Sequence, residues 1–210
     1  MQTYSHYIMT AVLGRVVKKQ QARADAGRWP PLRHTSLLLG SVAPDVPLIA
    51  ITLGLLLADV AGVKLSDNSG QVVSSNVGYL FETLFFHSPW VKAAHNLFHA
   101  PLLVLSYTAL GYWAWQQKRG WGPALFWFGL ACTLHTAIDI PLHYDDGPLL
   151  FFPFDWQSRF YSPVSYWDPA RYGRPFAIFE HLLVLGMVLY LIVDWRRSRR
   201  TQSAETVGRD

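Results

Sequence analysis

The sequence predicts an all-α fold, a helical membrane bundle of about four spans with an additional amphipathic helix at its N-terminus. Hydrophobic residues make up 51% of the 210 residues and charged residues 15%, whereas a soluble domain carries about 25% charged residues. The apolar residues lie in long runs, and the basic residues gather at the ends of these runs. Both features are typical of membrane spans and of the charges that orient them.

The first predicted element is an amphipathic helix over residues 4–20. Its apolar side chains recur at helical spacing, as in Ile8, Val12 and Val16. A helix of this kind could lie on the inner face of the membrane or pack against the bundle. We expect a polar, basic linker over residues 21–33 to follow it.

Four later apolar runs are candidate spans, because about 20 apolar residues cross a ~30 Å hydrocarbon core. They cover residues 37–58, 96–115, 121–138 and 176–193. The first run contains Asp45 between Pro44 and Pro47. Two prolines so placed predict a break or kink in the helix.

The segments between the spans are predicted to be less regular. Residues 59–78 are rich in Gly, Ser, Asn and Asp, which indicates an exposed loop. Residues 77–91 are apolar but short and fit a re-entrant or interfacial segment, whereas residues 141–175 are too irregular to span a membrane. We expect one membrane-embedded domain over residues 1–198 and a disordered basic and polar tail over residues 199–210.

Clusters of basic residues predict how the chain is oriented. They lie within residues 15–33, 118–119 and 196–200, and the positive-inside rule places them in the cytoplasm. The loops at 59–95 and 141–175 then face the other side. Because the clusters flank apolar runs instead of forming a folded basic face, they argue against nucleic acid as a partner.

Several ionisable side chains lie within or beside the apolar runs, where they are costly and usually functional. His95 and His99 stand four residues apart, so on a helix both imidazoles could reach one metal ion or two neighbouring ions. The alternative is a pair of helix-end histidines bonded to backbone or water. His135 and Asp139 have the same spacing, which fits either a metal site or a His–Asp hydrogen bond that only orients the two residues.

Three further groups have two interpretations each. Asp45 could present its carboxylate at the proline break, or it could cap the helix that restarts at Pro47. His6 could join a site or lie at the surface. Glu180 and His181 could provide a ligand or a supporting residue, or form an interfacial polar pair.

Three other histidines, His34, His87 and His143, are weaker candidates. His143 follows Pro141, so the helix that carries Asp139 cannot be relied on to place it.

In the predicted topology His95, His99, Asp139 and Glu180 lie near the outer ends of their helices, and His135 lies one turn deeper. Such convergence is how helical bundles build metal sites. Asp45 would lie deeper still in a straight helix, and His6 falls in the segment predicted on the inner side. A Gly-rich phosphate loop, a Gly-x-Ser-x-Gly elbow and a Cys-x-x-Cys pair are absent from the sequence.

The order of these motifs resembles a known family. The motifs are His6, the segment Leu-Gly-Ser-Val-Ala-Pro-Asp at 39–45, His95-x-x-x-His99, and His135-x-x-x-Asp139 followed by Gly-Pro-Leu-Leu-Phe-Phe-Pro-Phe at 147–154. They resemble inner-membrane, metal-dependent hydrolases of the type that includes a LexA-regulated membrane-bound hydrolase of enteric bacteria. That family is distantly similar to zinc-dependent phospholipase C.

The resemblance implies a multi-pass protein of the inner, cytoplasmic membrane that holds one or two zinc ions or another divalent metal. The ligands that it implies are His6, Asp45, His95, His99, His135 and Asp139. The chain departs from the family at Asn96 and Ala100, where relatives often have Arg and Ser. If that Arg holds a phosphate, another basic residue must replace it here, and the candidates are Arg159, Arg171 and Arg174.

The expected function is metal-assisted hydrolysis of a phosphoester or another ester in a lipid or amphiphilic substrate. The ion would lower the pKa of a bound water and stabilise charge on the attacked centre. Asp45 or Asp139, if not bound to metal, could act as the general base. The alternatives are a non-enzymatic membrane protein that binds, senses or transports a metal ion or protons, a haem protein, and a purely structural membrane protein.

Overall fold

The computed structural model describes residues 1–23 and 29–207, and for residues 200–207 it describes the backbone only. In this part of the chain the regular elements are helices, apart from one antiparallel bridge between Ser66 and Val72. The predicted all-α fold is therefore confirmed. Part of the predicted linker, residues 24–28, lies outside the described residues.

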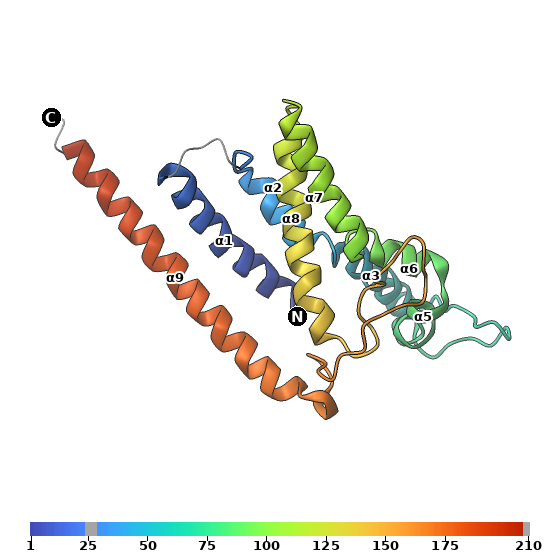
Figure 1. Cartoon of the computed structure of the whole chain (residues 1–210). Coiled ribbons are helices and arrows are strands. Elements are labelled where there is room, and N and C mark those ends of the chain that lie inside the picture. Colours follow the sequence, from blue (N-terminus) through green and yellow to red (C-terminus); the bar gives the residue numbers. More distant parts are fainter. Residues whose placement is uncertain (24–28, 208–210) are drawn as a thin grey trace.

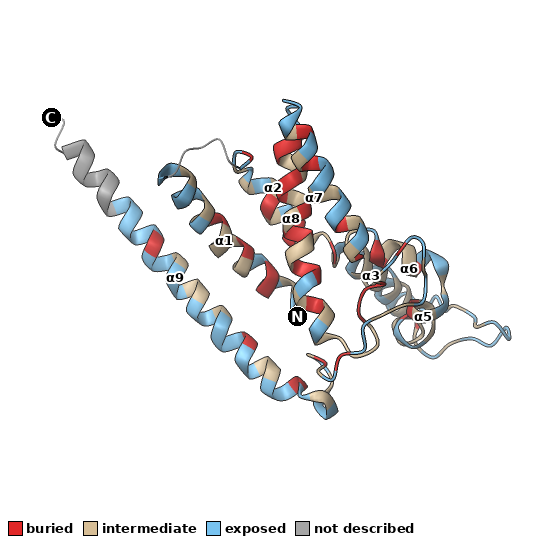
Figure 2. Cartoon of the chain, in the orientation of Figure 1, coloured by how far each residue is buried: buried red, intermediate tan, exposed pale blue. Residues whose placement is uncertain are grey.

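The main bundle consists of α1, α2, α7, α8 and α9 (Figure 1). Helix α8 packs against α7 and α2, and α1 packs against α2 and α9. Buried residues concentrate on α8, whereas α9 at the edge of the molecule is largely exposed (Figure 2). The bounds are Thr3–Arg23 for α1, His34–Val42 for α2, Pro101–Gln116 for α7, Gly122–Asp139 for α8 and Gly173–Val207 for α9.

Glycines allow these helices to approach closely. A Cβ atom on Gly40 of α2 would lie 2.2 Å from the carbonyl oxygen of Phe128 on α8. A Cβ atom on Gly129 of α8 would lie 2.6 Å from the backbone nitrogen of Thr108 on α7. Both distances are far below van der Waals contact, so only glycine fits at these crossings, as is common between membrane helices.

The predicted break in the first apolar run is present. Helix α2 ends at Val42, and α3 (Val46–Val60) continues at an angle of 52° to it. Helix α3 leaves the bundle toward a group of shorter helices (Figure 1). The break therefore places Asp45 at a corner instead of in the middle of a straight helix.

The break also frees two backbone carbonyl groups. Pro44 has no N–H, so the carbonyl oxygen of Gly40 has no helical partner. The thiol of Cys132 on α8 donates to it at 3.2 Å. The N–H of Asp45 donates to the carbonyl three residues back instead of four, which leaves the carbonyl oxygen of Ser41 available to a side chain of another helix.

Short helices close the end of the bundle at which α8 finishes. The segment predicted to be re-entrant or interfacial is a compact series of helical turns beside α3, with a core of Leu80, Phe85 and Val91. The elements are α4 (Asn76–Tyr79), the π-helical turn η1 (Leu80–Leu84), α5 (Phe85–His87) and α6 (Pro89–Asn96).

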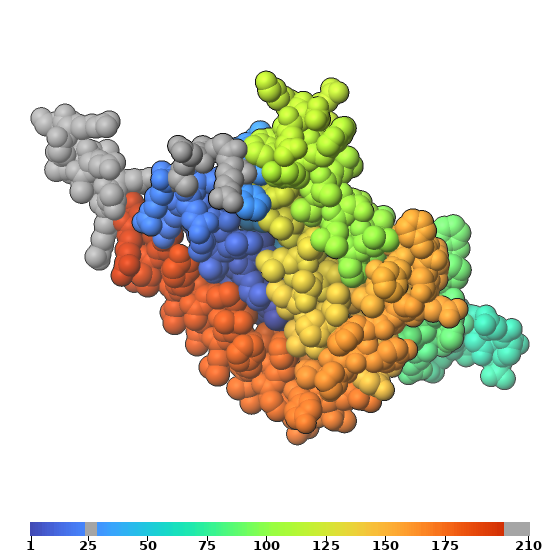
Figure 3. Space-filling model, in the orientation of Figure 1, coloured from blue at the N-terminus to red at the C-terminus, as the bar shows by residue number. Residues whose placement is uncertain are grey.

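The segment after α8 covers the same end. It contains the short turns η2 (Ile140–Leu142) and η3 (Pro169–Arg171). It is fixed to α6 by Asn96, whose side-chain oxygen accepts the buried N–H of Leu149 at 2.7 Å. The space-filling view shows this segment, yellow to orange, packed beside the start of α9 (Figure 3).

Among the described residues, two helices are long and apolar enough to cross a membrane, and the bent pair α2–α3 makes a third if it counts as one span. The two are Gly122–Leu142 and Gly173–Arg199. The run predicted at 96–115 differs from the expectation, because its helix starts only at Pro101 and has 16 residues. The count of four spans therefore stays a prediction.

Helix α1 takes the second of its two expected positions, against the bundle. It lies alongside α2 and α9, and Met1 is beside the end of α8 (Figure 1). Near its other end, Lys19 forms an ion pair with Asp194 of α9. This arrangement carries His6 to the end of the bundle where α8 finishes, beside Asp139, and not to the end that holds the basic pair at residues 118–119.

Helix α9 runs beyond the predicted span at 176–193 and continues through Val207. Residues 208–210 lie outside the described residues. The division into a domain over residues 1–198 and a disordered tail over residues 199–210 stays a prediction.

Candidate metal centre

Four side chains predicted as ligands meet at the closed end of the bundle. One ligand atom from each of Asp45, His99, His135 and Asp139 lies within 4.8 Å of the other three. Asp45 comes from the α2–α3 corner, His99 from the turn between α6 and α7, and the other two from α8. Carboxylate oxygens and imidazole nitrogens gathered at such distances are the donor set of a transition-metal site.

Asp139 is at the centre of this group. Its Oδ2 lies 3.0 Å from His135 Nε2 and 3.2 Å from His99 Nε2. Its Oδ1 is hydrogen-bonded to His6 Nε2 and to the amino group of Met1, each at 2.9 Å. A carboxylate at the C-terminal end of a helix meets an unfavourable helix dipole, so the two hydrogen bonds at Oδ1 supply part of the compensation that a buried charge requires.

His135 is oriented by the helix break. Its Nδ1 lies 2.8 Å from the carbonyl oxygen of Ser41, the group that the break leaves available. An N–H donated to a carbonyl fixes the tautomer and turns the other ring nitrogen into a ligand, as in many metal sites. Its Nε2 accordingly points at the two carboxylates, 3.0 Å from Asp139 and 3.4 Å from Asp45.

His99 is held through its backbone. The hydroxyl of Thr136, one position along α8 from His135, donates to the carbonyl oxygen of His99 at 2.9 Å. This bond ties the turn after α6 to the interior of α8. Thr136 and His99 are both buried, so the position of His99 depends on tertiary packing.

The buried nitrogens of this group fit a metal ion. His99 Nε2 and His135 Nε2 lie near carboxylate oxygens but make no hydrogen bond, and both nitrogens of His95 also have no partner. Unpaired buried polar atoms are costly, and a divalent cation would satisfy them. It would also balance the two carboxylates, Asp45 and Asp139, in an interior where isolated charge is unfavourable.

The remaining predicted ligands lie next to these four. The His6 ring stacks on the His135 ring, with centroids 3.6 Å apart. The His95 ring meets the His99 ring edge-on at 4.7 Å. The two histidines do not share one continuous helix as expected, because α6 ends at Asn96. The chain keeps turning, however, and the rings stay together. Burial, and then the neighbouring His99, hold the pKa of His95 well below its usual range.

Glu180 and His181 lie outside the group of four and fix the start of α1 to α9. Glu180 is buried and accepts the backbone N–H of Gln2 at 2.8 Å. His181 is exposed, and its Nε2 lies 2.8 Å from the hydroxyl of Tyr4. These contacts are those of supporting residues, since they position the segment that carries His6.

The three candidate arginines lie in different surroundings. Arg159 stacks over the ring of Phe85, donates to the carbonyl oxygen of Gly147, and contributes to lowering the pKa of His95. Arg171 lies over the Tyr144 ring and pairs with Asp168. Arg174 is exposed in the first turn of α9. Arg159 is therefore the one whose charge reaches the histidine cluster.

His143, a weaker candidate from the sequence, lies beside the centre. His143 Nε2 lies 3.9 Å from Asp139 Oδ2, while its Nδ1 lies 2.9 Å from Asp146. The indole N–H of Trp167 also donates to Asp146 at 2.9 Å. The turn η2 keeps the helical direction after Pro141, and the i, i+4 spacing from Asp139 to His143 was the signal that could have found it.

The fold and this group of residues define a class, a helical membrane protein with a buried His–Asp cluster at one end of its bundle. The chain belongs to the YdjM inner membrane protein family, which matches residues 1–201. It is thus an inner membrane protein, as predicted. No curated protein and no solved structure matches the chain.

Proposed function

We propose that this inner membrane protein is a metal-dependent hydrolase that cleaves a phosphoester, or another ester, in a lipid or amphiphilic substrate. The observation that carries the proposal is the convergence of Asp45, His99, His135 and Asp139 on one point. The resemblance to metal-dependent hydrolases at the same positions supports it independently.

Zinc is the proposed ion, because it accepts imidazole and carboxylate ligands. His99, His135 and Asp139 would hold it, which leaves Asp45 beside the ion and free to act as a base. The contacts of His135 with Ser41 and of His99 with Thr136 supply the surrounding hydrogen bonds that such ligands need. His6 and His95 border the group and would serve a second ion.

A zinc ion held here would supply Lewis acidity, which polarises the ester and makes a water molecule a stronger acid. Asp45 is the better candidate for the general base, because Asp139 already accepts from His6 and Met1. In hydrolysis the water oxygen bonds to phosphorus and the bond to the leaving oxygen breaks. Asp45 takes the proton from the water and passes it to the leaving oxygen.

We propose that the chain crosses the membrane four times, which would place the site beside lipid headgroups. Helix α7 has 16 residues, about 24 Å at 1.5 Å per residue, so it would cross a locally thinned bilayer together with its flanking turns. The basic clusters at residues 118–119 and 196–200 lie at the opposite end from the metal centre (Figure 1). By the positive-inside rule the centre would then face the non-cytoplasmic side, where it could meet lipid headgroups.

Transport or sensing of ions is the alternative. A transporter needs polar groups along a path through the bilayer. Further along α8, toward the basic end, the buried positions are occupied by Phe126, Trp127, Ala131 and Cys132. This apolar filling favours an enzyme with a site at one end.

The test is the zinc content of detergent-purified protein, measured by elemental mass spectrometry. We expect one or two zinc ions per chain in the wild type. The variants His135→Ala and Asp139→Ala should lose zinc while keeping the helical circular dichroism spectrum. His34→Ala, a histidine substitution outside the cluster, is the matched control and should keep its zinc.

Zinc-loaded protein is then assayed on a panel of phosphoesters and carboxylic esters. The variant Asp45→Asn should reduce kcat more than it reduces zinc content if Asp45 is the base. A wild-type protein that takes up no zinc or other divalent metal when supplied with it would overturn the proposed function.

A further inference from the structure

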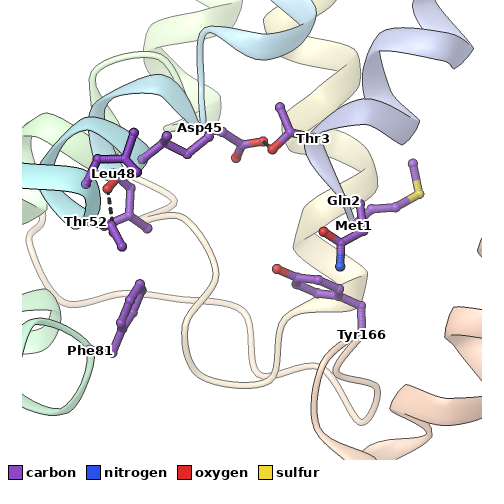
Figure 4. Close-up of a pocket in the computed structure, with 10 residues that line it drawn as sticks. Met1, Gln2, Thr3, Asp45, Leu48, Thr52, Phe81 and Tyr166 are labelled. Carbon is purple, nitrogen blue, oxygen red and sulfur yellow. Dashed lines mark hydrogen bonds between the residues drawn. The ribbon is translucent and has the colours of Figure 1, made fainter. Parts of the chain in front are cut away.

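A cavity of about 310 Å³ opens beside the metal centre (Figure 4). This volume is near the lower end of the ~300–1,000 Å³ range of small-molecule sites. Its walls come from the start of α1, the α2–α3 corner, α3 and the loop before η3. The residues that line it are Met1, Gln2, Thr3, Asp45, Leu48, Ile49, Thr52, Leu53, Phe81 and Tyr166.

The cavity reaches the metal centre through Asp45. The side chains of His99, His135 and Asp139 are 1–3% exposed, whereas that of Asp45 is 21% exposed. Among these four residues Asp45 is thus the point of access. Thr3 donates to its Oδ2 at 2.5 Å, which directs the carboxylate to the polar end of the cavity (Figure 4).

The other end of the cavity is apolar. Leu48, Ile49 and Leu53 of α3 line it together with Phe81. The hydroxyl of Thr52 donates to the carbonyl oxygen of Leu48 at 2.8 Å, so its hydrogen-bonding capacity as a donor is already used within the helix. A ligand that passes along this wall meets hydrocarbon surface.

The apolar wall continues onto the outer surface of the molecule. Helix α3 has no buried residue, and large apolar side chains are exposed along one stripe at helical spacing. They are Val46, Ile49, Leu53, Leu56, Leu57 and Val60. In a candidate membrane span such a stripe faces lipid, so the mouth of the cavity opens toward the hydrocarbon of the bilayer.

We propose that this cavity binds one acyl chain of a bilayer phospholipid, which enters sideways from the membrane and brings its headgroup ester to Asp45. The inference rests on the proposed function for the fate of the ester, whereas the binding of the chain stands on the cavity alone. The two ends of the cavity match the two ends of the ligand: the polar ester lies at Asp45 and the chain lies along Leu48 and Leu53.

The experiment uses zinc-loaded full-length protein in vesicles of phosphatidylethanolamine and phosphatidylglycerol. A small fraction of the lipid carries a photoactivated diazirine on one acyl chain. After illumination, mass spectrometry locates the labelled residues. We expect labelling to concentrate on residues 48–53 and Phe81.

The decisive variant is Leu53→Trp, which fills the cavity and should reduce labelling of Phe81 about tenfold. Leu57→Trp, on the same stripe of α3 but outside the cavity, is the matched control. In this variant Phe81 should be labelled to the same extent as in the wild type. The inference would be overturned if Phe81 were labelled equally in Leu53→Trp and the wild type. It would also be overturned if the label were spread evenly over α3 and α9.

The variant His99→Ala separates this inference from the proposed function. It should lose zinc and still be labelled at Phe81, because His99 makes no hydrogen bond with a residue that lines the cavity. If the wild type binds no zinc yet labels at Phe81, the acyl-chain site stands and the hydrolase proposal fails. If the wild type binds zinc and Phe81 is not labelled, the acyl-chain site fails and the hydrolase proposal stands.

Discussion

The imidazole Nδ1 of His135 lies 2.8 Å from the backbone carbonyl oxygen of Ser41 and so joins the interior of α8 to the broken end of α2. The helix break at Pro44 has two consequences. It turns Asp45 toward the centre, and it leaves the carbonyl oxygen of Ser41 as the acceptor that orients His135. The packing of α2 on α8 therefore sets the positions of Asp45 and His135. Substitutions that change this packing should also change the metal centre.

Gly40→Ala should destabilise the protein. Its new Cβ would lie 2.2 Å from the backbone of Phe128, so α2 must move away from α8 at a cost of about 1–3 kcal/mol. We expect a lower melting temperature in detergent and weaker zinc binding. Gly54→Ala is the matched control, since a Cβ at Gly54 meets nothing within 4 Å, and it should be neutral or slightly stabilising. Equal melting temperatures for the two variants would contradict the close packing of α2 on α8.

Thr136→Val should weaken zinc binding without unfolding the protein. The substitution removes the hydroxyl that holds the carbonyl oxygen of His99, and loss of such a supporting bond typically costs about 10–100-fold in metal affinity. Competition with a zinc chelator measures the effect. Thr133→Val removes a hydroxyl that bonds to Gly129 of α8 and to Thr108 of α7, neither of which contacts the candidate ligands, and should leave the affinity nearly unchanged. If both variants bind zinc with the same affinity, the hydroxyl of Thr136 does not position His99.

Lys19→Gln should loosen α1 from α9. Lys19 pairs with Asp194, whose side chain is mostly buried, so the substitution leaves a carboxylate without its cation. We expect a lower melting temperature than for Lys18→Gln, which changes an exposed neighbour. The double variant Lys19→Gln with Asp194→Asn should recover part of the loss, and strictly additive effects of the two substitutions would argue against direct pairing.

Asp146→Asn should change the response of stability to acid. Burial raises the pKa of Asp146, but the contact with His143 and the bond from Trp167 outweigh it and lower the pKa below the unfolded value of 3.8. A depressed carboxyl pKa stabilises the folded state above the unfolded pKa, and this contribution is lost as pH falls through the folded pKa. The difference in melting temperature between wild type and variant should be present at neutral pH and should close in strong acid.

This comparison is made on zinc-free protein, so that protonation of the metal ligands does not contribute. Asp145→Asn, which removes the neighbouring carboxylate, is the matched control for the loss of one negative charge in this segment. If the difference in melting temperature between wild type and Asp146→Asn stays constant across the acid range, the carboxyl of Asp146 does not stabilise the fold through its charge.

The sequence by itself determined the helical class, the break at Asp45 and the identity of the candidate ligands. These features are local: apolar runs predict helices, prolines remove backbone donors, and the four-residue spacing of His135 and Asp139 places both on one helix face. The packing contacts at Gly40 and Gly129 were not predictable in the same way, because they depend on which helices become neighbours.

Tertiary structure decided how distant segments meet at the centre. Only the packing of α1 against α2 and α9 brings His6 to Asp139, across 133 positions of sequence, and only the turn after Pro141 returns His143 to the same point. It also decided that Asp45 alone among the four converging ligands opens to a cavity. Spacing along a helix fixes which side chains share a face, whereas the approach of separate helices depends on close packing between surfaces that no local pattern encodes.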